Sequence, residues 1–147
     1  MNKNDLIKLF DEIFLPIGFK RKGNYWLSNG DVLSKMINLQ KSSNGNYFFI
    51  NYGYILKTLP LDNEIMHVYN RFASSDKAKQ KRITDLLDLD ADIANEERLF
   101  ELKILISNKI VFNVQAVNTE EDLLNVLKNR PHLNDIPLVV KKYFNLM

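Results

Sequence analysis

Apolar and polar positions near the N-terminus alternate with the period of an α-helix. Six apolar side chains recur at this spacing, with charged side chains between them: Leu6, Ile7, Leu9, Phe10, Ile13 and Phe14. Asn4 is a candidate N-cap, and Asp5 suits the first turn because its charge complements the helix dipole. Pro16 and Gly18 interrupt the pattern. We therefore expect an amphipathic helix over residues 4–15.

After a basic turn at residues 19–24, the apolar period falls to about 2, which is typical of β-strands. This pattern predicts four strands, over residues 25–27, 32–40, 47–56 and 65–73. Turn-forming residues separate them, including the Asn-Gly pairs at 29–30 and 44–45. Because the connections are short, we expect a four-stranded antiparallel meander.

The remaining residues return to helical spacing. Residues 83–89 favour a short helix or turn, and a long helix is expected to begin near Asp92. Residues 109–117 fit a strand or a continuation of that helix, and we favour the helix. Thr119 and Asp122 resemble a capping box for a helix through residue 129, and Pro137 suits the first turn of a last helix. This order predicts a single α+β domain over residues 1–147, with the C-terminal helices packed on one sheet face.

Composition excludes several kinds of chemistry. The chain has 147 residues, a formal net charge of +2 and no cysteine. A disulfide scaffold, a cysteine nucleophile and a thiolate metal site are therefore excluded. The charges are too evenly balanced to predict a nucleic-acid or membrane partner. Since no signal-peptide pattern and no bilayer-spanning apolar run occur, we expect a cytoplasmic protein.

The period of 2 sorts the strand residues into two faces. One face holds the apolar side chains and is expected to pack against the helices. The other collects polar and aromatic side chains, with Trp26 as a further candidate: Asn38, Gln40, Asn51, His67, Tyr69 and Arg71. Such a mixed surface suits ligand binding, although the solvated side of any antiparallel sheet has the same character.

Catalytic and metal-binding motifs are missing from the sequence. There is no nucleophile elbow, no phosphate-binding glycine loop and no His-Glu-x-x-His spacing. His67, near Arg71, could act as a general base, but a lone strand histidine is more often structural. Asp88, Asp90 and Asp92 alternate like the start of a calcium loop but lack its later glycine and glutamate. We expect no metal site and no cofactor.

A basic patch lies before the first predicted strand. Lys20, Arg21 and Lys22 stand close to Tyr25 and Trp26. Basic and aromatic side chains on a sheet raise the question of single-stranded nucleic-acid binding. The net charge of +2 is weak for a phosphate-binding protein.

Two stretches resemble a known bacterial family. They read IGFKRKGNYW at residues 17–26 and INLQKSSNGNYFFINYG at residues 37–53. Both are similar to segments of the domain-of-unknown-function family 4304 (DUF4304), and the likeness extends over roughly residues 5–75. Residues 67–71 stand where that family tends to have a strand with His and Arg. The resemblance implies a small α+β bacterial protein and supplies no activity.

Three functions remain as hypotheses. The first is a non-enzymatic binding module for a protein partner, for instance a toxin-neutralising, immunity-type protein. The immunity role rests on analogy with other small, single-domain bacterial proteins without a cofactor. The second is a small-molecule or enzymatic pocket on the polar sheet face around His67 and Arg71, where arginine would hold an anionic group. The third is single-stranded nucleic-acid binding by the basic patch. The sequence leaves the oligomeric state open.

Overall fold

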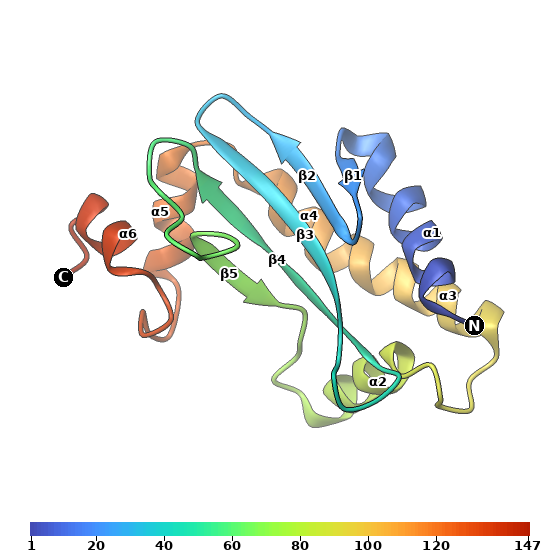
Figure 1. The fold of residues 1–147 in the computed structure, drawn as a ribbon. Coiled ribbons are helices and arrows are strands. Elements are labelled where there is room, and N and C mark those ends of the chain that lie inside the picture. The colour runs from blue at the N-terminus through green and yellow to red at the C-terminus, as the bar shows by residue number, and fades with distance from the viewer.

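A five-stranded antiparallel sheet forms the centre of the computed structural model, which describes residues 1–147 (Figure 1). Its strands follow one another in sequence order: β1 (Lys20–Lys22), β2 (Tyr25–Asn29), β3 (Leu33–Lys41), β4 (Phe48–Leu56) and β5 (Val68–Arg71). The expected α+β meander is confirmed, with one strand more than the four predicted.

The additional strand is β1, which lies in the stretch predicted to be a basic turn. Lys20, Arg21 and Lys22 pair with the start of β2 and form one edge of the sheet. Pairing at an edge needs only backbone groups, so this strand shows no apolar alternation. The turn to β2 is made at Gly23, whose φ of 62° favours glycine.

The helices occupy one side of the sheet and its ends: α1 (Lys3–Phe14), α2 (Lys77–Leu87), α3 (Asn95–Ile106), α4 (Phe112–Ala116), α5 (Glu120–Lys128) and α6 (Leu138–Tyr143). A 3₁₀ turn, η1 (Leu15–Ile17), follows α1, and a π turn, η2 (Ser107–Val111), joins α3 to α4. In Figure 1 the rod formed by α3 and α4 runs behind the sheet, and α2 lies near the turn between β3 and β4. The prediction of helix over residues 109–117 is confirmed for most of that stretch.

Spacing of the buried side chains accounts for the π turn. Leu102, Ile106, Ile110 and Val114 are all buried, and each follows the previous one by four residues. An ordinary α-helix has 3.6 residues per turn, so such a row would drift around the rod. The wider turn at Ser107–Val111 absorbs this drift and keeps the row against the core.

Two capping boxes begin helices of this fold. Asn2, rather than the predicted Asn4, caps α1, because Asp5 at the third helical position returns a bond to the Asn2 backbone. Thr119 and Asp122 form the predicted box at the start of α5. The end of α1 is also confirmed, since Gly18 adopts the left-handed conformation after η1 with a φ of 99°.

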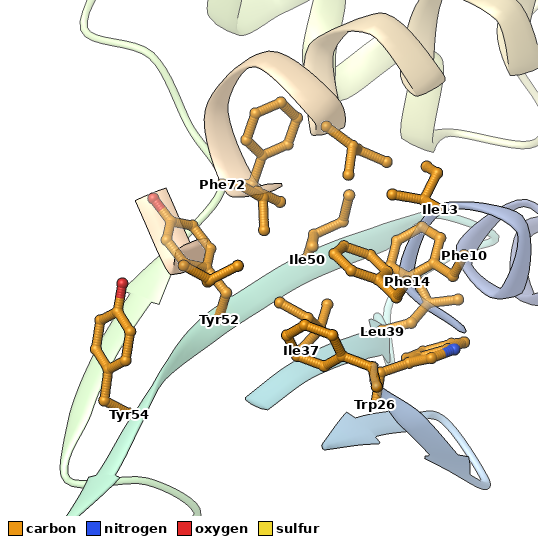
Figure 2. Close-up of a cluster of buried hydrophobic side chains, with 14 of the residues drawn as sticks. Phe10, Ile13, Phe14, Trp26, Ile37, Leu39, Ile50, Tyr52, Tyr54 and Phe72 are labelled. Atoms are coloured by element: carbon orange, nitrogen blue, oxygen red, sulfur yellow. The ribbon is translucent and has the colours of Figure 1, made fainter. Parts of the chain in front are cut away.

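The hydrophobic core lies between the sheet and the helices. Figure 2 shows Phe10 and Phe14 of α1 close to Trp26, Ile37 and Ile50 of the sheet. Alternate residues of β4 enter this core, as the period predicted: Phe48, Ile50, Tyr52, Tyr54 and Leu56. The helices therefore cover one face of the sheet and leave the strand residues of the other face uncovered by helix.

A buried arginine organises the chain between α2 and α3. The guanidinium of Arg98, which is 1% exposed, donates to four backbone carbonyls, those of Asp85, Leu86, Asp88 and Ala91. Carbonyls at a helix C-terminus lack partners within the helix, and a cation there also complements the helix dipole. Arg98 therefore caps α2 and fixes the turn that contains the alternating aspartates.

None of the helices has the length and apolar character required to span a bilayer.

Candidate functional site

The register of the strands aligns one row of side chains across the uncovered face of the sheet, here called the open face. Lys22 pairs with Tyr25, Tyr25 with Asn38, Asn38 with Asn51, and Asn51 with Arg71. Directly paired residues of antiparallel strands point to the same face. This cross-sheet row therefore spans all five strands and carries a cation at each end.

Asn51 lies at the centre of a hydrogen-bonded network on this face. Its amide nitrogen donates to Asn38 Oδ1 at 3.0 Å and to Gln40 Oε1 at 2.9 Å. Its oxygen accepts from the Tyr69 hydroxyl at 2.6 Å and from Arg71 Nε at 3.1 Å. These four bonds use the full capacity of an asparagine side chain, so Asn51 can be only 2% exposed without an orphaned polar atom.

Arg71 is fixed in place by the same neighbours. Its Nη2 donates to Gln40 Oε1 at 3.0 Å and to the Tyr69 hydroxyl at 3.2 Å. Its guanidinium also covers the ring of Phe49, with Cζ 4.1 Å from the ring centroid. The cation is thus exposed to solvent and yet held in one orientation, which lowers the entropy lost when it binds an anion.

An apolar groove lies beside this network on the open face. It has a volume of about 550 Å³. Leu27, Met36 and Ile65 line it, and Lys22 and Tyr25 stand at its border with the cross-sheet row. Ile65, from the loop between β4 and β5, is 47% exposed. The open face therefore offers an apolar anchor site next to a polar and cationic row.

The loop between β4 and β5 closes over one end of the open face. Gly53 makes the close approach of this loop and of the start of β5 possible, since a Cβ atom there would lie 2.6 Å from the Met66 sulfur of the loop and 1.8 Å from the Val68 carbonyl oxygen of β5. Glycine alone fits at such a position.

Five of the predicted site residues come together in the network, which consists of Asn38, Gln40, Asn51, Tyr69 and Arg71. Their shared face is therefore confirmed, while their role in binding stays a prediction. Tyr25 and Phe49 belong to the same surface and were missing from the predicted site. The signal that could have found Phe49 is the period of 2 itself, since it stands two residues from Asn51 on one strand.

Trp26 was wrongly placed as a candidate for the open face. It pairs with Ile37 of the core face and is fully buried against Phe10, with ring centroids 5.0 Å apart. Its indole Nε1 donates to Asp11 Oδ1 at 2.9 Å. Because α1 supplies both an apolar wall and an acceptor, the largest ring of the sheet belongs inside.

His67 was also wrongly placed on that face. Strand β5 begins at Val68, so His67 belongs to the preceding loop, and its side chain is 1% exposed. Its Nδ1 accepts from the Leu56 backbone N–H at 2.8 Å, and its Nε2 lies 2.8 Å from the Pro60 carbonyl oxygen. Nε2 must therefore carry the proton and donate it. With both nitrogens engaged, His67 anchors the loop and is not available as a general base near Arg71.

The basic patch divides between the two faces. Lys22 faces the open side with Tyr25, and Lys20, two residues earlier, shares that side. Arg21 points the other way and forms an ion pair with Asp11 at 3.1 Å. None of the five strands contains an aspartate or glutamate. The open face is therefore cationic through Lys20, Lys22 and Arg71.

No cluster of three or more histidine, aspartate or glutamate side chains is arranged to hold a metal ion. The alternating aspartates act locally instead. Asp88 ends α2 and accepts from the Asp90 backbone N–H, while the Asp90 carboxylate accepts from Asn46 at 3.1 Å. The open face itself presents hydrogen-bonding groups, positive charge and an apolar groove.

Fold and surface together define a class: a small α+β protein with an antiparallel meander, helices on one face and a polar, cationic open face. The chain belongs to the family DUF4304, a domain of unknown function, which matches residues 10–129. No curated protein and no solved structure matches the chain. The family assignment agrees with the resemblance seen in the two sequence stretches and names no activity.

Proposed function

We propose that this chain is a non-enzymatic, cytoplasmic bacterial protein that binds a protein partner through the open sheet face, and that the partner presents an acidic segment. The observation that carries this proposal is the cross-sheet row, which has Lys22 at one end and Arg71 at the other on a sheet without strand carboxylates. An immunity-type protein that neutralises a toxin is one form of such a module.

The groove next to the row supports a macromolecular partner. Interfaces combine an apolar centre with a polar rim, and arginine and tyrosine are enriched at their energetic hot spots. Leu27, Met36 and Ile65 supply the apolar part, Tyr25 lines the same groove, and Arg71 stands at the far end of the cross-sheet row. A partner that inserts one apolar side chain into the groove and places carboxylates at Lys22 and Arg71, the two ends of the row, satisfies both parts.

An enzymatic pocket around His67 and Arg71 is less well supported by this geometry. His67 is buried in the loop between β4 and β5, and both of its ring nitrogens are engaged. Arg71 lies in the network with Asn51 and Gln40 instead. The two residues therefore do not converge on a shared substrate position.

Nucleic acid is also less well supported as the partner. Binding of single strands relies on aromatic rings that are free to stack on bases. The Phe49 ring is instead covered by the Arg71 guanidinium. The formal net charge of +2 adds little general attraction for phosphates.

Site-specific photo-crosslinking in the native host tests the proposal. A photoreactive amino acid replaces Tyr25 or Gln40 on the open face, or Phe112, which is 70% exposed on α4, as the matched control. We expect a protein adduct at Tyr25 or Gln40 and none at Phe112. An adduct found only at Phe112, or one that nuclease removes, would overturn the proposal.

The partner identified in this way is then purified for affinity measurements. Arg71→Glu and Lys22→Glu should each weaken binding at least about tenfold, because each places a carboxylate opposite an acidic segment. Lys77→Glu, at an exposed position of helix α2, should leave the affinity unchanged. Equal effects of all three substitutions would show that the open face does not recognise acidic groups.

A further inference from the structure

A second cavity lies between α2 and α3, away from the groove described above. It has a volume of about 380 Å³, which falls within the range of roughly 300–1,000 Å³ typical of small-molecule sites. Its lining comes from three places in the chain: the segment after β5, helix α2, and the rod of α3 with its π turn. It shares no lining residue with the groove on the open face.

One wall of this cavity is apolar and rigid. Phe72 and Ile83 belong to the hydrophobic core and are only 4% and 5% exposed, and Leu105 is half-buried beside them. Their side chains are fixed by core packing, so this wall is present before any ligand binds. It suits the hydrocarbon or aromatic part of a small molecule.

The rest of the lining carries excess positive charge. Three cations, Lys79, Arg82 and Lys109, and one carboxylate, Glu101, line the cavity, which gives a formal net charge of +2. Glu101 is already engaged, because its two oxygens accept from Arg82 at 2.9 Å and 2.6 Å. These bonds hold the pKa of Glu101 below its ordinary value, so the carboxylate stays ionised and committed to Arg82.

Unpaired donors remain for a ligand. The Lys79 ammonium forms no ion pair within the chain, and Arg82 uses Nε and Nη2 for its glutamate partners and leaves Nη1 free. Lys109 places its ammonium 2.5 Å from the Ala73 carbonyl oxygen, which leaves two of its three protons available. The surplus positive charge of the cavity therefore comes from Lys79 and Lys109, which form no ion pair, because Arg82 is shared by Glu97 and Glu101.

The π turn places part of this lining. Asn108 and Lys109 stand within the turn at Ser107–Val111, at the border of the cavity. Such wide turns interrupt the hydrogen-bond ladder of a helix and are frequently found at functional sites. The turn that keeps the buried row in the core therefore also brings a lysine and an amide to the cavity.

We propose that this cavity binds a small organic anion, with an apolar body against Phe72, Ile83 and Leu105 and a carboxylate or phosphate group at Lys79, Arg82 and Lys109. The apolar wall and the cationic rim each recognise one part of the molecule, so neither a simple inorganic ion nor a neutral hydrocarbon satisfies the site. This site is independent of the proposed partner on the open face.

Titrations followed by NMR with benzoate, phenyl phosphate, inorganic phosphate and neutral benzyl alcohol as probes test this inference. We expect at least one of the two aromatic anions to shift the amide signals of residues 79–83 and 105–109. Inorganic phosphate and benzyl alcohol should bind at least about tenfold more weakly, because each lacks one of the two recognised parts. Absence of any shift at millimolar probe, or shifts confined to the groove of Leu27 and Met36, would overturn the proposal.

The same titration is repeated on two variants and one control, with whichever of benzoate and phenyl phosphate binds more tightly. Leu105→Trp fills the apolar side, and Lys79→Glu reverses an exposed charge at the rim, so each should weaken its binding at least about tenfold. Lys103→Glu changes an exposed lysine of α3 that does not line the cavity and should leave binding unchanged. Unfolding midpoints establish that each variant is folded. Equal weakening by Lys79→Glu and Lys103→Glu would show only general charge attraction and would contradict the site.

Discussion

The guanidinium carbon of Arg71 lies 4.1 Å from the centre of the Phe49 ring, across the pairing of β4 with β5. Asn51 is directly paired with Arg71 and stands two residues beyond Phe49 on the same strand. The arginine therefore reaches diagonally over the sheet to stack on the ring while it bonds to the Asn51 oxygen at 3.1 Å. This geometry makes Arg71 the point where the network, the aromatic surface and the positive charge of the open face meet.

Arg71→Ala should lower the free energy of unfolding by about 1 kcal/mol, because it removes an exposed cation–π contact and hydrogen bonds to Asn51 and Gln40. Urea unfolding measures the change. Lys77→Ala, on the exposed side of α2, should have an effect close to zero and serves as the control. If both substitutions had the same small effect, the stacking and bonding of Arg71 would contribute nothing to stability.

The sequence predicts the face of a strand residue correctly where the strand is long and the turn that joins it to its neighbour is short. Strands β3 and β4 each have nine residues, which is long enough for the period of 2 to be certain, and a short Asn-Gly turn separates them. The alternation therefore predicts the face of Asn38, Gln40 and Asn51 correctly. Tyr69 and Arg71 followed the same alternation in β5.

The sequence misplaces Trp26 and His67 because the hydrophobic pattern around each residue is too short or too irregular to assign a face. The first predicted strand has only three residues, which is too short for alternation to place Trp26, whereas its pairing with Ile37 places it on the core face. The predicted fourth strand began too early, and His67 belongs to a loop whose path depends on tertiary contacts. The sequence pattern gave no reason to expect that Arg98 would be buried, because its partners are backbone carbonyls that no side-chain pattern reveals.

His67→Ala should lower the free energy of unfolding by about 2–3 kcal/mol, because it leaves the Leu56 N–H and the Pro60 carbonyl without their partner. Amide hydrogen exchange should also become faster across residues 57–67, since His67 joins the two ends of that loop. His132→Ala is the matched control, because His132 is exposed. Equal stability and equal exchange in the two variants would contradict the anchoring role.

Arg98→Met should be among the most destabilising substitutions in this chain. Methionine retains the apolar stem but leaves four carbonyls of the turn after α2 without their donor, so we expect a loss of at least about 3 kcal/mol. Chemical unfolding of both proteins provides the comparison.

Arg98→Lys and Arg82→Met are the informative controls for that experiment. Lysine keeps the charge but cannot reach four carbonyls with the geometry of the guanidinium fork, so it should restore only part of the stability. Arg82 forms its ion pairs at the surface, where solvent screens them, so its substitution should cost much less stability than Arg98→Met. A full rescue by lysine would show that charge alone, rather than the fork, stabilises the turn.

The capping box of α5 should make part of the stability depend on pH. The Asp122 carboxylate accepts from the backbone N–H groups of Asn118 at 2.9 Å and Thr119 at 3.1 Å. These bonds favour the ionised form and hold the pKa of Asp122 below its ordinary value. A depressed pKa means that the contribution is present above the pKa of the unfolded chain, about 4, and is lost as the pH falls through the lower folded value.

Asp122→Asn should therefore lower the thermal unfolding midpoint at about pH 6, and the difference from the unsubstituted protein should shrink below about pH 4. Thermal unfolding across this range measures both effects. Glu121→Gln changes the adjacent exposed carboxylate, which forms no hydrogen bond to the helix terminus, and should show a smaller pH-dependent difference. A difference between Asp122→Asn and the unsubstituted protein that stayed constant from about pH 6 to about pH 2 would mean that the ionised carboxylate does not stabilise the start of α5.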